Sequence, residues 1–194
     1  SGRVLDARGR PLRDALVERA RAGVKVRLLA DALGSARCRR LFAELVAAGG
    51  ELAWFHPTRF GRVWQRPWAN LRNHRKLVVI DGRIGYTGGM NITDDQNERV
   101  DPAAYRDLHL RLEGNVVRAL QLVFVEDWAY ATGERDFIGE VARQTPRQPT
   151  GPVCAQVVPS GPDSPWEAIH RMHVGAIHAA RERVWLVTPY FVPG

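Results

Sequence analysis

Residues 70–91 bring together side chains that could act on a phosphate ester. The stretch contains His74 and Lys76, and it closes on Gly88-Gly89 followed by Asn91. Because side chains alternate faces along a β-strand, His74 and Lys76 are expected to point the same way. The glycines let the backbone approach a ligand closely, and Asn91 offers a side-chain amide. A nucleophile, a cation and neutral donors around one point suit a phosphate ester.

A predicted hairpin positions these residues. Leu77–Ile80 is an apolar, β-branched run, Asp81-Gly82 follows it, and Arg83–Thr87 is a second short run. Asp-Gly between two such runs is a strong signal for a tight hairpin turn. The imidazole of His74 and the ammonium of Lys76 are therefore expected at the open end of this hairpin.

The use of lysine at residue 76 is unusual for this chain. The sequence has 28 Lys and Arg residues, and only Lys25 and Lys76 are lysines. A compact ammonium binds phosphate as a point charge and is not interchangeable with the planar guanidinium of Arg.

The surrounding pattern predicts alternating helices and strands. Helices are expected at 11–22, 37–48, 115–131 and after the capping box Ser164-Pro165-Trp166-Glu167, with Ile169, Met172, Ala176, Ile177 and Ala180 of the last one facing inward. Strands are expected at 24–30, 51–55, 108–112, 153–158 and 184–187. Such alternation favours an α/β fold with a mainly parallel or mixed sheet covered by helices.

Bulk properties narrow the choice of partner. The formal net charge is +7, which favours anionic partners such as nucleic acid, an acidic membrane face or a phosphorylated substrate. The loop 56–72 interleaves aromatic residues with arginines, which either stack on bases, sit at lipid headgroups, or fold onto the body of the protein. Two cysteines are too few for a disulfide framework. His170 and His173 lack a suitably spaced third ligand, so a metal site is disfavoured.

The spacing of the 70–91 stretch resembles the signature of the phospholipase D superfamily. That signature is His-x-Lys, four residues, Asp, six residues, Gly-Gly-x-Asn. This sequence matches it at His74, Lys76, Asp81, Gly88, Gly89 and Asn91. The resemblance implies a phospholipase D-like α/β fold, in which a mixed sheet is flanked by helices on both faces.

Wider stretches resemble the bacterial cardiolipin synthase branch of this superfamily. The similar pieces are Asn70 to Lys76, Arg106-Asp107, Phe124 with Asp127-Trp128, Ser160 to Asp163, and Thr188 to Pro193. Enzymes of this branch carry two signature motifs in two similar halves, whereas this sequence has one. We therefore expect an excerpt of a longer protein, holding one half and the first strand of the second.

The resemblance also implies a division of the chain and a location. Residues 1–132 are expected to form the first half, 133–152 a proline-containing linker, and 153–194 a strand-helix-strand segment that leads into the missing half. The parent protein is expected at the cytoplasmic membrane of a bacterium, with anchoring helices. No run of 18 apolar residues is present in the sequence, so the fragment itself is expected to be soluble.

The resemblance implies a two-step covalent mechanism without a metal or other cofactor. His74 would attack phosphorus and form a phosphohistidine, and Lys76 and Asn91 would hold the phosphate oxygens beside Gly88 and Gly89. A second His from the missing half, or from a second copy of the chain, would act as general acid and base. With phosphatidylglycerol as the incoming alcohol, the product would be cardiolipin.

Two carboxylates are candidates for supporting His74. Asp81 lies at the predicted turn, where strand alternation does not bring it to the imidazole, so it fixes either the turn or a neighbouring network. Asp107 is our candidate for the carboxylate that orients His74. The alternative for Asp107 is an ordinary ion pair with Arg106 or Arg111.

Three functional hypotheses remain open from the sequence. The first is the catalytic half of a phosphatidyltransferase. The second is a homodimeric phosphodiesterase or nuclease, favoured by the charge of +7 and by Trp64 and Trp68. The third is an excerpt that folds but performs no chemistry.

Overall fold

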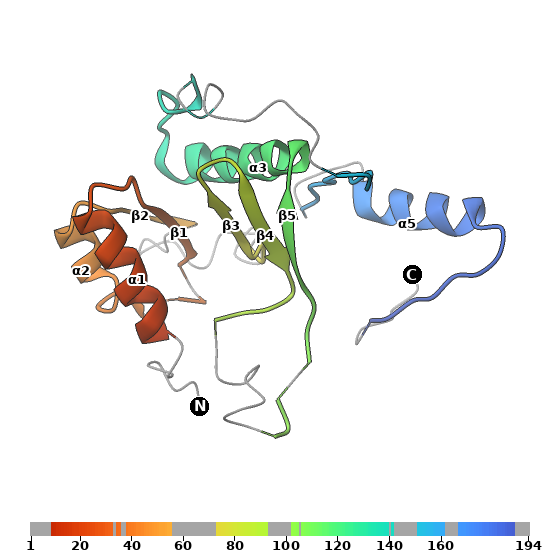
Figure 1. Ribbon diagram of the computed structural model, residues 1–194, viewed down its shortest axis with the longest axis horizontal. Helices are drawn as coiled ribbons and strands as arrows, with labels where there is room; N and C mark the ends of the chain where they lie inside the picture. The colour runs from red at the N-terminus through yellow and green to blue at the C-terminus, as the bar shows by residue number, and fades with distance from the viewer. Residues whose placement is uncertain are drawn as a thin grey trace, which may run out of the picture. The chain divides into compact units, whose positions relative to one another are not determined.

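The computed structural model describes residues 9–32, 34–35, 38–55, 73–92, 102–104, 106–139, 141, 151–161 and 167–188. The chain divides into two compact units, residues 1–157 and residues 158–194. Among the described residues, the first unit holds two small β-sheets with helices α1, α2 and α3, and the second holds helix α5 (Ala168–Ala179) (Figure 1).

The first sheet is parallel. It pairs β1 (Arg27–Asp31) with β2 (Glu51–Phe55), and the register starts with Arg27 opposite Glu51. Parallel neighbours need a crossover connection, and this one carries the short helix α2 (Ala43–Ala47). At the first cross-strand pair, Arg27 Nε donates to Glu51 Oε2 at 2.9 Å. The two strands therefore begin at an ion pair and continue into apolar residues.

Helices cover both faces of the β1–β2 sheet. On one face, α1 (Gly9–Arg21) and α2 pack through a buried cluster of Val17, Ala20 and Leu45, joined by Leu28 of β1. On the other face, α3 (Asn115–Thr132) packs through a cluster of Ala53, Val125, Trp128 and Phe137, joined by Leu29 of β1. Leu28 and Leu29 enter different clusters because successive strand residues point to opposite faces.

The second sheet is antiparallel and contains the predicted hairpin. Its order is β3 (Leu77–Ile80), β4 (Ile84–Gly88) and β5 (His109–Glu113). At the turn, Arg83 N donates to the Ile80 carbonyl at 3.0 Å. Asp81 and Gly82 both have positive φ, 52° and 64°. Asp tolerates this left-handed backbone better than most residues, and Gly adopts it freely, which explains the Asp-Gly pair.

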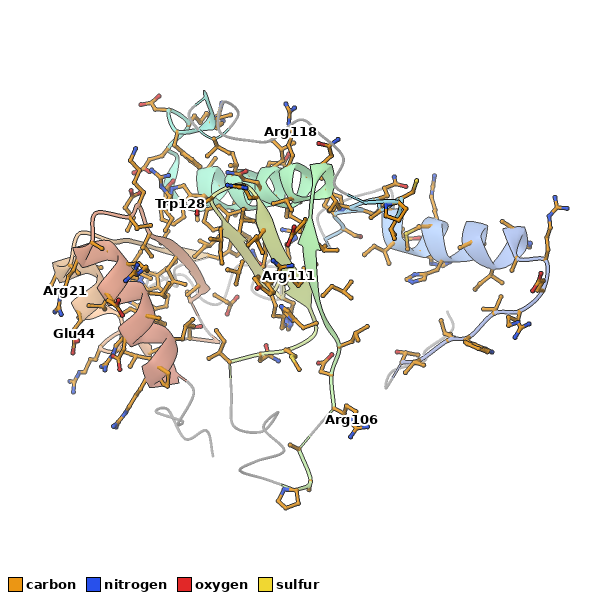
Figure 2. All side chains as sticks on the ribbon, in the orientation of Figure 1. Arg21, Glu44, Arg106, Arg111, Arg118 and Trp128 are labelled. Atoms are coloured by element: carbon orange, nitrogen blue, oxygen red, sulfur yellow. The ribbon has the colours of Figure 1, made fainter. Side chains whose placement is uncertain are left out.

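Helix α3 joins the two sheets. Its first half lies on the β3–β5 sheet, where an added Cβ at Gly85 would lie 2.8 Å from Leu120 Cδ1. Its second half brings Trp128, which is 2% exposed, into the cluster with Ala53 of β2. In Figure 2, Trp128 lies near the end of α3 and Arg118 projects from the side of the helix away from the sheets. One helix therefore sets the position of both sheets.

Arg111 lies on the face of the β3–β5 sheet opposite α3. It stands across from Tyr86 in the register and lies over the strands in Figure 2. Hydrogen bonding to Tyr86, together with that to Glu113, raises the pKa of the Arg111 guanidinium above its ordinary value. Val78 and Ile80, which share this face by alternation, are exposed.

The expected α/β class is confirmed, with a difference in detail. The parallel and antiparallel strands, expected in one mixed sheet, form two sheets among the described residues. The stretch 133–152, predicted as a linker, contains a core residue near its start, because Phe137 is 7% exposed and its ring packs edge-on to Trp128 at 6.4 Å. Sequence patterning missed this because one Phe among polar residues carries no periodic signal.

Two predicted strands and one predicted buried face are wrong for the described residues. Residues 153–158 and 184–187 form no strand. A strand needs a hydrogen-bonding neighbour, and no described segment pairs with them. Helix α5 has no buried residue, and Ile169, Met172 and Ile177 are 41%, 44% and 48% exposed. Its apolar stripe is present, but no described element of its own unit covers it.

Some predictions fall outside the described residues. The loop 56–72 with its aromatic and arginine residues lies there, as do residues 164–166 of the predicted capping box. Within the described part of the chain, no helix combines the length and the hydropathy needed to cross a bilayer.

Candidate active site

His74 and Lys76 lie in the segment that leads into β3. His74 is exposed and Lys76 is partly buried. The Lys76 Nζ donates a hydrogen bond of 2.8 Å to the main-chain carbonyl of His74. The ammonium is therefore bonded to the His74 backbone at the open end of the hairpin. A shared direction of the two side chains stays a prediction.

The residues on either side of His74 are tied to α3. Asn73 Nδ2 donates to Asp127 Oδ2 at 2.8 Å, and Arg75 Nη1 donates to Asp127 Oδ1 at 2.5 Å. The Asp127 side chain is only 14% exposed. A second carboxylate, Asp31 at the end of β1, accepts a bond of 3.3 Å from the Asn73 backbone N–H. The His74 segment is thus anchored to both the helix and the parallel sheet.

Asp81 lies at the hairpin turn, at the far end of β3 from His74. The five residue steps of extended chain from Lys76 to Asp81 span roughly 16 Å at about 3.3 Å per step. The turn geometry gives Asp81 a structural role, since the residue takes a left-handed φ of 52°. Its predicted catalytic role stays a prediction.

Gly88 and Gly89 lie where β4 passes close to the start of β5. The Gly89 N–H donates to the Leu108 carbonyl at 2.9 Å. A Cβ at Gly88 would overlap the same carbonyl and the backbone of His109. Glycine is therefore needed at residue 88 because β4 and the start of β5 approach each other closely. Phosphate binding by these glycines stays a prediction.

Asp107 packs directly against Gly89. A Cβ at Gly89 would overlap both oxygens of the Asp107 carboxylate. Asp107 Oδ1 accepts a hydrogen bond of 2.7 Å from the Leu108 N–H. The carboxylate therefore lies at the Gly-Gly end of β4, and its role in orienting His74 stays a prediction. Arg111, one of its two expected ion-pair partners, pairs with Glu113.

Asn91 lies three residues beyond the end of β4 and is exposed. An exposed amide offers both a donor and an acceptor to a ligand. The binding of phosphate oxygens by Asn91 likewise stays a prediction.

A metal site at His170 and His173 gains no third ligand among the described residues. Glu167 Oε2 lies 3.9 Å from His170 Nδ1, and both side chains are largely exposed. No group of three or more His, Cys, Asp or Glu side chains that could hold a metal ion occurs in the part of the chain that the structure describes.

Sequence reasoning missed Asp31 and Asp127 as partners of the His74 segment. Asp127 is 54 residues from Asn73, so no local pattern links them. One signal was present: Asp127 follows Val123 by four residues on the buried stripe of α3, where a carboxylate needs a partner. Asp31 ends a parallel strand, an edge where functional groups often gather.

The arrangement can perform nucleophilic chemistry on an anionic ester. An exposed imidazole can attack, and a nearby ammonium can neutralise the charge on the oxygens of the attacked group. The residues that flank His74 are held by the partly buried carboxylates of Asp31 and Asp127, so the His74 backbone is fixed in place.

The comparisons with known proteins agree with this arrangement. The family model described as "Cardiolipin synthase, PLD-like domain" matches residues 5–108, more than half of the chain and the whole signature. The chain is 40% identical over 190 residues to a cardiolipin synthase of Geobacillus kaustophilus, and 41% identical to the major cardiolipin synthase ClsA of Bacillus subtilis. Each alignment covers 97% of this chain.

The chain spans 38% and 39% of the lengths of these two relatives. No solved structure matches the chain. The family model covers residues 5–108, and the alignments with the relatives extend over nearly the whole sequence. The chain therefore belongs to the cardiolipin synthase family of phospholipase D-like proteins.

Proposed function

We propose that this chain carries the first catalytic half of a phosphatidyltransferase of the cardiolipin synthase type. The observation that supports this best is the exposed His74 with the Lys76 ammonium bonded to its carbonyl at 2.8 Å. The two relatives described above are both named as cardiolipin synthases, and these names suggest the class of reaction.

In the first step, a neutral nitrogen of His74 attacks the phosphorus of a phospholipid. A nitrogen–phosphorus bond forms, the phosphorus–oxygen bond to the leaving alcohol breaks, and the phosphatidyl group stays on His74. Lys76 and Asn91 hold the non-bridging oxygens, and their fixed placement lowers the barrier by electrostatic stabilisation. Gly88 and Gly89 bring the backbone near the same phosphate.

In the second step, the oxygen of an incoming alcohol bonds to phosphorus and the nitrogen–phosphorus bond to His74 breaks. A second imidazole, which protonates the leaving alcohol in the first step, removes the proton from the incoming alcohol in the second. That imidazole comes from a second half of the parent protein or from a second copy of the chain. With phosphatidylglycerol as both donor and acceptor, the products are cardiolipin and glycerol. With water, the outcome is hydrolysis.

The proposed substrate places the site at a membrane. Phosphatidylglycerol is an anionic lipid, and the net charge of +7 favours an anionic surface. In this proposal, residues 1–132 form the first half, 133–152 link it to 153–194, and the parent protein acts at the cytoplasmic membrane of a bacterium.

The same charge supports one alternative, a homodimeric phosphodiesterase that acts on nucleic acid. Phosphatidylglycerol vesicles and single-stranded DNA, tested side by side at matched salt, separate the two. Where a second half or a second copy of the chain completes the site, we expect consumption of the lipid, none of the DNA, and no lipid turnover by His74→Ala. DNA cleavage that requires His74 would favour the alternative. If neither substrate reacts and no adduct forms on His74, the chain performs no chemistry by itself.

A further inference from the structure

We propose that Asp127 is a positioning residue for the reacting pair, because its carboxylate holds both neighbours of His74. The proposal rests on the proposed function of His74 and Lys76. The contacts that support it can be tested without that function.

Both oxygens of Asp127 are used by the His74 segment. Oδ2 accepts from the Asn73 amide at 2.8 Å, and Oδ1 accepts from the Arg75 guanidinium at 2.5 Å. Hydrogen bonds to a charged carboxylate are stronger and more directional than neutral ones. With 14% of its side chain exposed, Asp127 has little competition from water.

The Asn73 side chain also forms a local turn around His74. Its Oδ1 accepts a 2.9 Å bond from the Arg75 backbone N–H, the i to i+2 pattern of an Asx turn. Its own backbone N–H donates to Asp31 Oδ2 at 3.3 Å. The turn around His74 is therefore held by contacts with α3 and with the end of β1, and by the hydrogen bond between Asn73 and Arg75 within the turn.

The hydrogen bonds to Asp127 come from Asn73 and Arg75 and not from the reacting residues His74 and Lys76. Asn73 and Arg75 reach Asp127, whereas His74 between them is exposed, and the Lys76 ammonium returns to the His74 carbonyl. Asp127 therefore acts through the residues beside His74 and has no need to touch the substrate. A small misplacement of a nucleophile lowers the rate strongly, whereas binding of the substrate is less sensitive.

The test compares Asp127→Asn with Glu126→Gln. Both changes remove one negative charge from neighbouring residues of α3, but Glu126 is exposed. Asn73→Ala removes the Asn73–Asp127 hydrogen bond by a change outside α3. It replaces Asp127→Asn in the test if that variant does not fold. Amide hydrogen exchange then reports on the segment: we expect at least about tenfold faster exchange at residues 73–76 in Asp127→Asn, with residues 116–125 unchanged.

The chemical readout uses bis(4-nitrophenyl) phosphate, whose leaving group departs as the anion and needs no general acid. We expect Asp127→Asn to slow the release of the first equivalent of nitrophenolate by about 10- to 100-fold, with KM changed less than about threefold. The losses in Asn73→Ala and Asp127→Asn should add up to more than the loss in the double variant, because the two changes share the Asn73–Asp127 contact. A role in general stability alone would give no such split between rate and KM.

Two failures are distinguishable. If the wild-type chain releases no nitrophenolate, the proposed function fails, and the positioning role is then decided by amide exchange. There, Asp127→Asn must speed exchange at residues 73–76 relative to Glu126→Gln. Equal exchange at these residues in the two variants, or additive losses in the double variant, would overturn the inference.

Discussion

The Lys76 ammonium lies 2.8 Å from the main-chain oxygen of His74 and donates a hydrogen bond to it. This bond ties a positive charge to the backbone of the residue that carries the exposed imidazole. A phosphodiester oxygen carries negative charge and is a stronger acceptor than a carbonyl, so an entering substrate can replace this bond. The Lys76 ammonium is thus positioned beside the His74 backbone before an anionic substrate binds.

Replacing Lys76 by Met or by Arg should each slow the first release of nitrophenolate from bis(4-nitrophenyl) phosphate by about 100- to 1000-fold. Arg is not expected to rescue, because its planar guanidinium cannot take the place of a compact ammonium. Lys25→Arg, at the other lysine of the chain, is the matched control and should be neutral. Near wild-type rates in Lys76→Arg would show that any positive charge suffices.

Gly89→Ala should destabilise the chain by about 1–3 kcal/mol, because its Cβ would overlap the Asp107 carboxylate. Urea unfolding measures the change. Gly139→Ala is the control, since nothing lies within 4 Å of a Cβ there. Adding Asp107→Ala should recover part of the loss, because it removes the overlapping atoms. A double variant as unstable as the sum of the single ones would mean that the overlap is not the cause.

Local patterns predicted the elements near the site well. The apolar runs on either side of Asp81-Gly82 are the strands β3 and β4, and helix α3 starts and ends within one residue of the predicted 115–131. These predictions hold because tight turns and amphipathic helices depend on neighbouring residues.

The long-range contacts of the site could not be predicted in the same way. The bond between Asn73 and Asp127 and the packing of Asp107 on Gly89 depend on how the helix and strands come together. The inward face expected for α5 failed for a related reason. An apolar stripe predicts that a helix has a face to bury, but not which element buries it.

Trp128→Ala should lower the free energy of unfolding by about 3–5 kcal/mol, since Trp128 is 2% exposed at the centre of the α3 cluster. Trp185→Ala serves as the control, because that side chain is 84% exposed and its loss should change stability by less than about 0.5 kcal/mol. Thermal unfolding of both variants checks this. Equal losses would contradict the packing described for α3.

Asp81→Asn and Asp107→Asn should differ in chemistry. Asp81 lies at the turn with a φ of 52°, a conformation that Asn also tolerates, so we expect a rate within about threefold of wild type. Asp107→Asn should slow nitrophenolate release by about 10- to 100-fold if this carboxylate orients His74. The reverse order of the two effects would assign the supporting carboxylate to Asp81.

The most direct test of the central claim is mass spectrometry of the chain after reaction with bis(4-nitrophenyl) phosphate. We predict one 4-nitrophenyl phosphoryl group, on the peptide that contains His74, lost on mild acid treatment and absent from His74→Ala. A stable adduct elsewhere, or nitrophenolate release that persists in His74→Ala, would contradict the account.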